Sequence, residues 1–137
     1  MLERYVNSVK DSNVKLMKRL PKDDYDTMIG ACDIGLIFLD RRFTIPNFPS
    51  RLLAYMQAKL PVIAATDVNT DIGDVIVDGG FGWWCESRNA ADFKSLVKIA
   101  MNTIPVLLKE NEWRYLNDYY SVETSYNIIK GVEYEDN

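Results

Sequence analysis

The 137-residue sequence contains no histidine and only two cysteines. Without histidine, the chain cannot supply an imidazole general base, a Ser-His or Cys-His nucleophile pair, or a His-ligated metal site. Any catalytic base would therefore be a carboxylate. Cys32 and Cys85 lie within apolar patterns, so we expect both to be buried free thiols. We expect no bound metal and no cofactor.

Long apolar runs and an excess of positive charge are also missing. The longest apolar run, Ile34 to Leu39, is far shorter than the roughly 20 residues that cross a bilayer, and no apolar leader follows Met1. Sixteen basic against twenty acidic residues give a net charge of −4, which opposes binding to nucleic acid or anionic lipid. The sequence therefore predicts a cytoplasmic protein that neither spans a membrane nor binds nucleic acid.

Apolar patterns along the chain alternate between those of strands and those of helices. With 47% apolar and 26% charged residues, the composition is that of one folded domain. Short strands are expected at 14–20, 34–39, 61–65 and 81–85, and amphipathic helices at 22–32, 50–59 and 71–78. Three more helices follow, starting at Asn89, Pro105 and Ser121.

This alternation predicts an α/β fold, because parallel strands need crossover connections. We expect three layers, a Rossmann-like parallel sheet flanked by helices, followed by a helical carboxyl-terminal tail. Residues 34–39 form an unbroken apolar run and are expected to be a central strand covered on both faces.

Ligands of such sheets bind beyond the carboxyl ends of the strands, where this sequence has two candidate loops. The first comprises Asn47, Phe48, Pro49, Ser50 and Arg51, between a strand and a helix start. Free backbone N–H groups there favour an anion, and the Arg51 guanidinium would suit a diphosphate. An ordinary helix start with a solvated Arg51 has the same spacing.

The second candidate loop follows the strand at 61–65 and is rich in hydroxyl, amide and carboxylate groups. Such groups could bind sugar hydroxyls, but they are also ordinary turn and cap residues. The candidates are Thr66, Asp67, Asn69, Thr70, Asp71 and Gly73.

Two stretches resemble a known family. They are Asp23-Asp-Tyr-Asp with Ala31-Cys-Asp-Ile-Gly-Leu-Ile, and Asn47-Phe-Pro-Ser-Arg-Leu-Leu-Ala-Tyr-Met-Gln-Ala-Lys-Leu-Pro-Val-Ile-Ala65. Both are similar to the carboxyl-terminal half of retaining, nucleotide-sugar-dependent glycosyltransferases of the GT-B fold, especially bacterial enzymes that build capsule, exopolysaccharide and O-antigen chains. By this resemblance residues 1–137 are a single partial donor-binding domain, with a motif-bearing core at about 12–88 and a helical tail at 89–137.

The resemblance implies transfer of a hexose from a nucleotide sugar, UDP-linked, to a saccharide or lipid-linked acceptor. It assigns the donor diphosphate to residues 47–51 and the sugar and ribose to the candidates between Thr66 and Gly73. The base side would be formed by Arg19, Leu20 and Pro21. In the full enzyme, the resemblance implies a peripheral place at the inner membrane.

The sequence departs from the family in two ways. The opening strands of the donor domain and the separate amino-terminal domain find no match, so we expect a domain truncated at its start. It would be inactive alone and would need that domain or a partner chain. The two glutamates of the family motif fall on Pro46 and Ala54.

Such a truncation would leave a sheet edge unpaired, and unpaired edges recruit further strands. We therefore expect a homodimer, formed through the sheet edge or through an aromatic tail. The tail residues are Trp113, Tyr115, Tyr119, Tyr120 and Tyr126.

Two alternatives to a donor-binding domain remain open at this point. One is a catalytically inactive remnant that serves as an interaction domain. The other is a receiver-type phosphoacceptor domain, suggested by Asp40 and Thr66 at strand ends. A receiver also needs an acidic pair after its first strand and a lysine after its fifth. Here the pair Asp23-Asp24 precedes a helix, and residues 81–86 contain no lysine.

Overall fold

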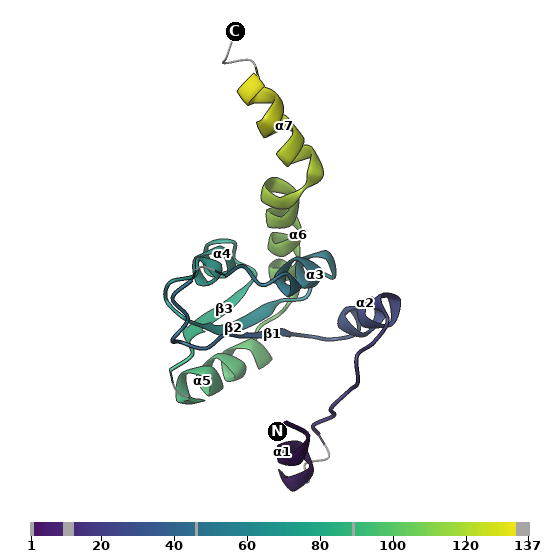
Figure 1. Ribbon diagram of the computed structural model, residues 1–137, viewed down its shortest axis with the longest axis vertical. Coiled ribbons are helices and arrows are strands. Elements are labelled where there is room, and N and C mark those ends of the chain that lie inside the picture. The colour runs from purple at the N-terminus through teal and green to yellow at the C-terminus, as the bar shows by residue number, and fades with distance from the viewer. Residues whose placement is uncertain (1, 10–12, 46, 89, 134–137) are drawn as a thin grey trace.

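A computed structural model of the protein describes residues 2–9, 13–45, 47–88 and 90–133. Its elements form an α/β fold with a parallel sheet and a carboxyl-terminal helical extension (Figure 1). In chain order they are α1 (Leu2–Val9), α2 (Lys22–Gly30), β1 (Gly35–Phe38), α3 (Arg51–Gln57), β2 (Val62–Thr66), α4 (Ile72–Asp78), β3 (Gly82–Glu86), α5 (Ala90–Met101), α6 (Val106–Tyr120) and α7 (Val122–Glu133).

The three strands pair in the order β1-β2-β3, and both pairs are parallel. Helices α3 and α4 cover one face of the sheet and α5 covers the other, which gives three layers (Figure 1). Right-handed crossovers in one direction place α3 and α4 on the same face. The predicted α/β class, parallel sheet and flanking helices are confirmed.

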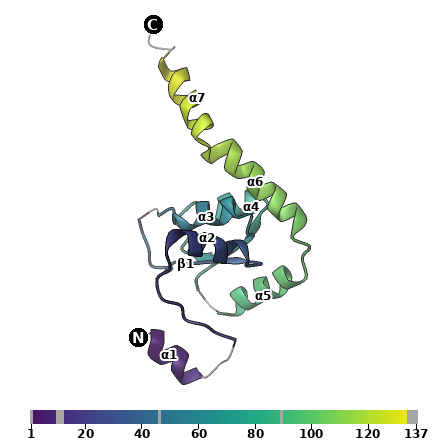
Figure 2. The same cartoon turned by 90° about the vertical axis from the view of Figure 1, so that its right-hand side faces the viewer.

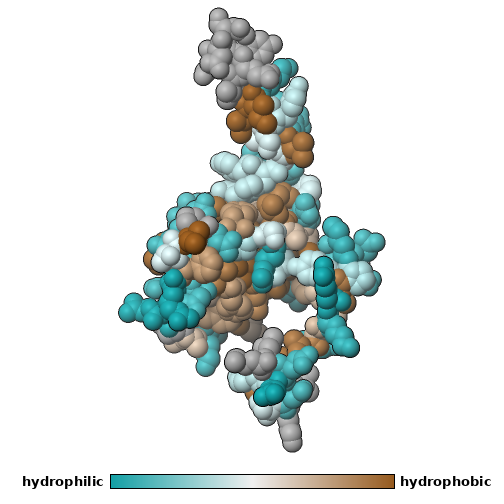
Figure 3. Space-filling model, in the orientation of Figure 1, coloured by the Kyte–Doolittle hydropathy of each residue, from teal (hydrophilic) through white to brown (hydrophobic). Residues whose placement is uncertain are grey.

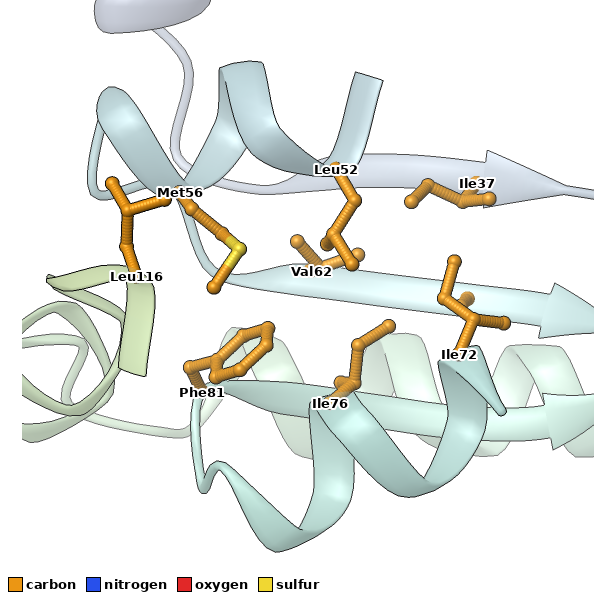
Figure 4. Close-up of a cluster of buried hydrophobic side chains, with 9 residues drawn as sticks. Ile37, Leu52, Met56, Val62, Ile72, Ile76, Phe81 and Leu116 are labelled. Carbon is orange, nitrogen blue, oxygen red and sulfur yellow. The ribbon is translucent and has the colours of Figure 1, made fainter. Parts of the chain in front are cut away.

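The hydrophobic core lies between the sheet and the α3–α4 layer (Figure 4). Met56 of α3 and Phe81, just before β3, are fully buried there, and Leu116 of α6 closes the same end of the core. All five residues of β2 are buried. Strand β2, predicted as the buried strand at 61–65, is therefore the centre of the sheet.

The prediction that residues 34–39 form a central strand is wrong. Strand β1 lies at the edge of the described sheet and alternates buried and exposed residues. Ile37 is fully buried beneath α3, whereas Leu36 is 41% exposed and Phe38 is 53% exposed on the α5 side. One face of the continuous apolar run is only partly covered, because α5 packs mainly on β2 and β3.

The strand predicted at 14–20 is also wrong, because this segment is extended but pairs with no strand of the described chain. Its side chains are exposed except for Leu20, which is half-buried. The segment links α1 to α2 along the outside of the molecule (Figures 1 and 2). Thus three of the four predicted strands enter the sheet.

The predicted helices are confirmed, with ends shifted by at most three residues. The cap expected at Ser121 is present, since its Oγ accepts a hydrogen bond from the Thr124 backbone N–H at 3.0 Å. The cap expected at Asn89 lies outside the described residues. Helix α7 projects away from the sheet (Figures 1 and 2), and apolar side chains are exposed along it (Figure 3), including Ile128 and Ile129.

The cysteines differ from expectation. Cys32 is exposed just beyond the end of α2, so the prediction of a buried thiol is wrong there. Cys85 in β3 is partly buried, and this burial raises the pKa of its thiol. No helix in the described ranges is long and apolar enough to span a bilayer.

Candidate functional site

The loops that follow β1 and β2 meet beyond the carboxyl ends of the strands, at the left of Figure 1. A hydrogen bond joins them directly, since the Asn69 side-chain amide donates to the Phe43 carbonyl at 2.7 Å. Parallel strands bring their carboxyl ends to one edge of the sheet, and this bond fixes one loop against the other. The two candidate loops therefore belong to one region of the molecule.

In the first loop, some of the five predicted residues pack against the rest of the protein and others are exposed to solvent. Pro49 is buried, and the Phe48 ring packs on Tyr120 with centroids 5.5 Å apart. Ser50 and Arg51 are exposed at the start of α3, where Ser50 makes no side-chain capping hydrogen bond. Asn47 is half-buried. Asn47, Ser50 and Arg51 are thus the polar side chains of this loop that a ligand can reach.

In the second loop, Asp67 supports the turn from within. It is fully buried, and its Oδ1 accepts hydrogen bonds from the backbone N–H groups of Asn69 at 2.8 Å and Thr70 at 3.0 Å. A carboxylate that accepts these bonds holds the turn closed, as an Asx turn does. Thr66 is also fully buried. Asp67 and Thr66 therefore shape the loop rather than face solvent.

Gly73 and Asp71 stand at the start of α4. A side chain at Gly73 would meet the Trp84 ring, since a Cβ built there lies 2.9 Å from three of its atoms. This close approach explains why glycine fits at residue 73 and no larger residue does. Asp71 is exposed and remains available to a ligand.

A hollow of about 430 Å³ lies at the same edge of the sheet, lined by Leu39, Asp40, Arg41, Arg42 and Ser87. Asp40 accepts two hydrogen bonds from the Arg42 guanidinium, at 2.9 and 2.6 Å, which holds the pKa of the Asp40 carboxyl well below its usual range. The exposed Arg41 enters no such pair in the described chain. Ser87 Oγ is buried there and has no hydrogen-bond partner among the described residues.

Sequence reasoning did not select Arg41, Arg42 or Ser87 as site residues. The signal was available, because two arginines in succession follow the apolar run after a single residue, Asp40. Their cationic groups lie where an α/β sheet binds ligands.

Tyr120, at the end of α6, was expected in an aromatic tail and not in the site. Its ring contacts Phe48, and burial, together with the nearby Tyr115 and Asp71, raises the pKa of its phenol. Tyr120 therefore lies between the two candidate loops. No local pattern could have shown this, because the contact joins residues far apart in the chain.

The remaining predicted residues lie elsewhere. Arg19, Leu20 and Pro21 precede α2, which lies at the opposite end of the sheet from the two loops (Figure 1). Ala54, one position of the family's glutamate motif, is half-buried in α3, and Pro46, the other, lies outside the described residues.

The receiver hypothesis gains no support from this edge of the sheet. Asp40 is engaged by Arg42. Within the described ranges, no three or more Cys, Asp or Glu residues gather in a group that could hold a metal ion, whereas a receiver uses clustered carboxylates for that purpose.

The sequence is similar to part of a curated protein. Over 86 residues, which are 63% of this chain, the sequence is 24% identical to the Probable glycosyltransferase WbjE of Pseudomonas aeruginosa. The matched region is 22% of that protein, so the chain aligns with about a fifth of the length of this relative. No family model and no solved structure matches the chain.

Proposed function

We propose that this chain supplies donor binding to a glycosyltransferase that moves a sugar from a nucleotide-sugar donor, UDP-linked, to a saccharide or lipid-linked acceptor. The observation that carries the reaction class is the similarity to a probable glycosyltransferase over 63% of the chain. The place of the site is supported by the Asn69–Phe43 bond, which holds two polar loops together at the carboxyl edge of the sheet.

The charges at this edge suit a diphosphate. Arg41 and Arg51 are exposed, and each can offer paired N–H donors to phosphate oxygens. Arg42 contributes less positive charge because Asp40 already neutralises it. Asn47 and Ser50 would add neutral donors beside Arg51.

The sugar and ribose would lie on the side of the second loop. Asp71 and Asn69 are its exposed polar residues, whereas Asp67 and Thr66 are buried beneath them. Sugar hydroxyls commonly donate to carboxylates and accept from amides. We therefore assign contact with the ligand to Asp71 and Asn69, and a supporting role to Asp67 and Thr66.

The proposal includes cell-surface polysaccharide synthesis as the process and inactivity of this chain by itself. Both rest on the resemblance of residues 12–88 to GT-B enzymes, which assemble their active site between two domains. Accordingly, the purified chain should bind a nucleotide diphosphate without turnover. Steady product formation from a UDP-sugar by the 137-residue chain would contradict the inactivity.

An NMR titration of the ¹⁵N-labelled chain tests donor binding. UDP should shift the amides of Asn47, Ser50 and Arg51, and uridine, which lacks the diphosphate, should leave them unchanged. Arg41 should respond with them. Absence of shifts at residues 47–51 in millimolar UDP would reject the site, and equal shifts with uridine would reject its assignment to the diphosphate.

A further inference from the structure

The open edge of β1 offers unpaired backbone groups. Gly35 donates its backbone N–H to the Pro61 carbonyl at 2.9 Å, and Leu39 donates to the Ala65 carbonyl at 3.0 Å. Successive residues of a strand turn their backbone groups to opposite sides. Gly35, Ile37 and Leu39 therefore face β2, and Leu36 and Phe38 turn their N–H and carbonyl groups outward.

The outward groups are almost unused in the described chain. The Leu36 carbonyl accepts one hydrogen bond of 3.3 Å from the Tyr55 hydroxyl, and none of the described strands pairs with this side of β1. Unpaired backbone groups of this kind are a template for another strand.

The side chains of the same two residues form an apolar surface next to this edge. Leu36 and Phe38 are exposed on the α5 side, and the Phe38 ring contacts Phe93 of α5 with centroids 5.1 Å apart. A strand added to β1 with apolar residues on that side would extend the surface and remove it from water.

The segment 14–20 has the properties of the strand that this edge lacks. It runs as a drawn-out trace between α1 and α2 (Figure 1) and pairs with no described strand. Val14 and Leu16 are exposed and two residues apart, a spacing that a β-strand places on one side. Its seven residues exceed the four of β1. It is also basic, through Lys15, Lys18 and Arg19.

The surroundings of β1 complement this basic charge. Asp33 lies two residues before the strand, and α2, which leads into it, carries Asp23, Asp24 and Asp26, of which Asp26 pairs with Lys22. All four carboxylates are exposed. Opposite charges around a pairing edge favour the docking of one partner over others.

We infer that two copies of this chain form a dimer by strand exchange, in which residues 14–20 of each copy add to the free edge of β1 in the other. The interface is self-complementary, because each copy supplies one donor segment and one acceptor edge. It does not depend on the proposed sugar transfer.

The affinity should be modest because the paired segments are short. A dissociation constant of about 100 μM is expected for so small an interface. Sedimentation equilibrium of the full chain from about 10 to about 500 μM should therefore show a monomer–dimer equilibrium. A strict monomer throughout this range would overturn the inference.

Substitutions on each side of the contact identify the surface. Leu16→Pro removes a backbone donor from the added strand, and Phe38→Glu places a charge on the acceptor surface; each should raise the dissociation constant about tenfold or more. Ile104→Glu, an equally drastic change at an exposed residue before α6, is the control and should leave it unchanged. Loss of dimer in the control alone, or no loss in either test variant, would contradict the proposed surface. Circular dichroism verifies that each variant is folded. Because Leu16 is exposed and lies outside the sheet, Leu16→Pro should disturb the fold of the monomer less than Phe38→Glu does.

Cross-linking separates exchange between copies from pairing within one copy. In a Cys32→Ser, Cys85→Ala background, Leu16→Cys in one tagged chain and Phe38→Cys in another are mixed with a short bismaleimide. A cross-link between the differently tagged chains supports the dimer. A second chain carries both Leu16→Cys and Phe38→Cys. If it cross-links only within itself at every concentration, residues 14–20 fold back on β1 of the same copy, and the proposed exchange is overturned.

Discussion

The indole Nε1–H of Trp84 donates a hydrogen bond of 2.8 Å to the hydroxyl of Thr66, across the β2–β3 pair at its carboxyl end. Thr66 is fully buried, and its own hydroxyl donates to the Asp67 carbonyl at 3.1 Å. The bond from Trp84 thus connects β3 to the first residues of the loop that Asp67 holds closed.

Removal of this bond should weaken the fold modestly. Trp84→Phe deletes the indole donor and part of the ring, and should lower the free energy of unfolding by about 1 to 3 kcal/mol. Thr66→Val should cost about 1 kcal/mol, because it leaves the indole without its partner. Thermal unfolding measures both, with Thr66→Ser as the control that keeps the hydroxyl. If Thr66→Val, which keeps the shape of the side chain, unfolds at the temperature of the parent protein, the bond does not contribute.

Arg51 should dominate any affinity for a nucleotide diphosphate. Loss of a charge-assisted hydrogen bond costs about 1.5 to 3 kcal/mol, so Arg51→Ala should weaken UDP binding about ten- to a hundredfold. Calorimetric or NMR titration would give the dissociation constants. Arg4→Ala, in α1 and far along the chain from both loops, removes the same charge and should change affinity little. Equal effects of the two substitutions would point to general electrostatics instead of a site.

Gly82 should tolerate no side chain. A Cβ at this residue would lie 2.1 Å from the Val62 carbonyl oxygen, a backbone atom of the central strand. Gly82→Ala should therefore force β2 and β3 apart and destabilise the protein by about 3 kcal/mol or more. Gly131→Ala in α7, where nothing lies within 4 Å of the new Cβ, is the matched control and should be neutral or stabilising by about 0.5 to 1 kcal/mol. Denaturant unfolding compares them, and equal midpoints would contradict the proposed contact.

Glu112 should make stability depend on pH. Its side chain is fully buried in α6, and neither carboxylate oxygen has a hydrogen-bond partner among the described residues. This burial raises the pKa of the carboxyl from 4.5 to about 8, although the charge of Lys109 acts in the opposite direction. The folded state therefore binds the proton more tightly than the unfolded state does.

Stability should consequently fall as pH rises from about 4.5 to about 8 and then level off, by at most about 1.4 kcal/mol per pH unit. Glu112→Gln removes the titrating carboxyl. The free energy of unfolding of this variant should therefore change less across this pH range and should exceed that of the parent protein above pH 8. Glu110→Gln, at an exposed residue of the same helix, should keep the parent's profile. Urea unfolding between pH 5 and 9 tests this, and parallel profiles for all three proteins would exclude Glu112 as the cause.

The periodicity of the sequence predicted the helices and strands well, but it predicted less well which elements pack against one another. The helix at 50–59 and the strand at 61–65 match α3 and β2, because apolar spacing directly reflects local geometry. The run at 34–39 carries no sign that one of its faces lacks a partner. Whether Leu36 and Phe38 are covered depends on where α5 packs, and this is decided by the whole fold.

The candidate site shows the same limit. Loops after parallel strands could be predicted to lie together, and the Asn69–Phe43 bond joins the segments that follow β1 and β2. The burial of Asp67 and the approach of Tyr120 to Phe48 could not be predicted. A carboxylate in a turn has the same sequence pattern whether it faces solvent or accepts backbone hydrogen bonds. Tyr120 reaches the site only because α6 packs against α3.

The strand order β1-β2-β3 repeats the order of the strands along the chain. As the protein leaves the ribosome, each new strand can dock on the one made just before it, so no strand waits for a partner that is synthesised much later. The last step is different. Leu116 joins the core that contains Met56 and Phe81, so this core stays open at one end until α6 has emerged.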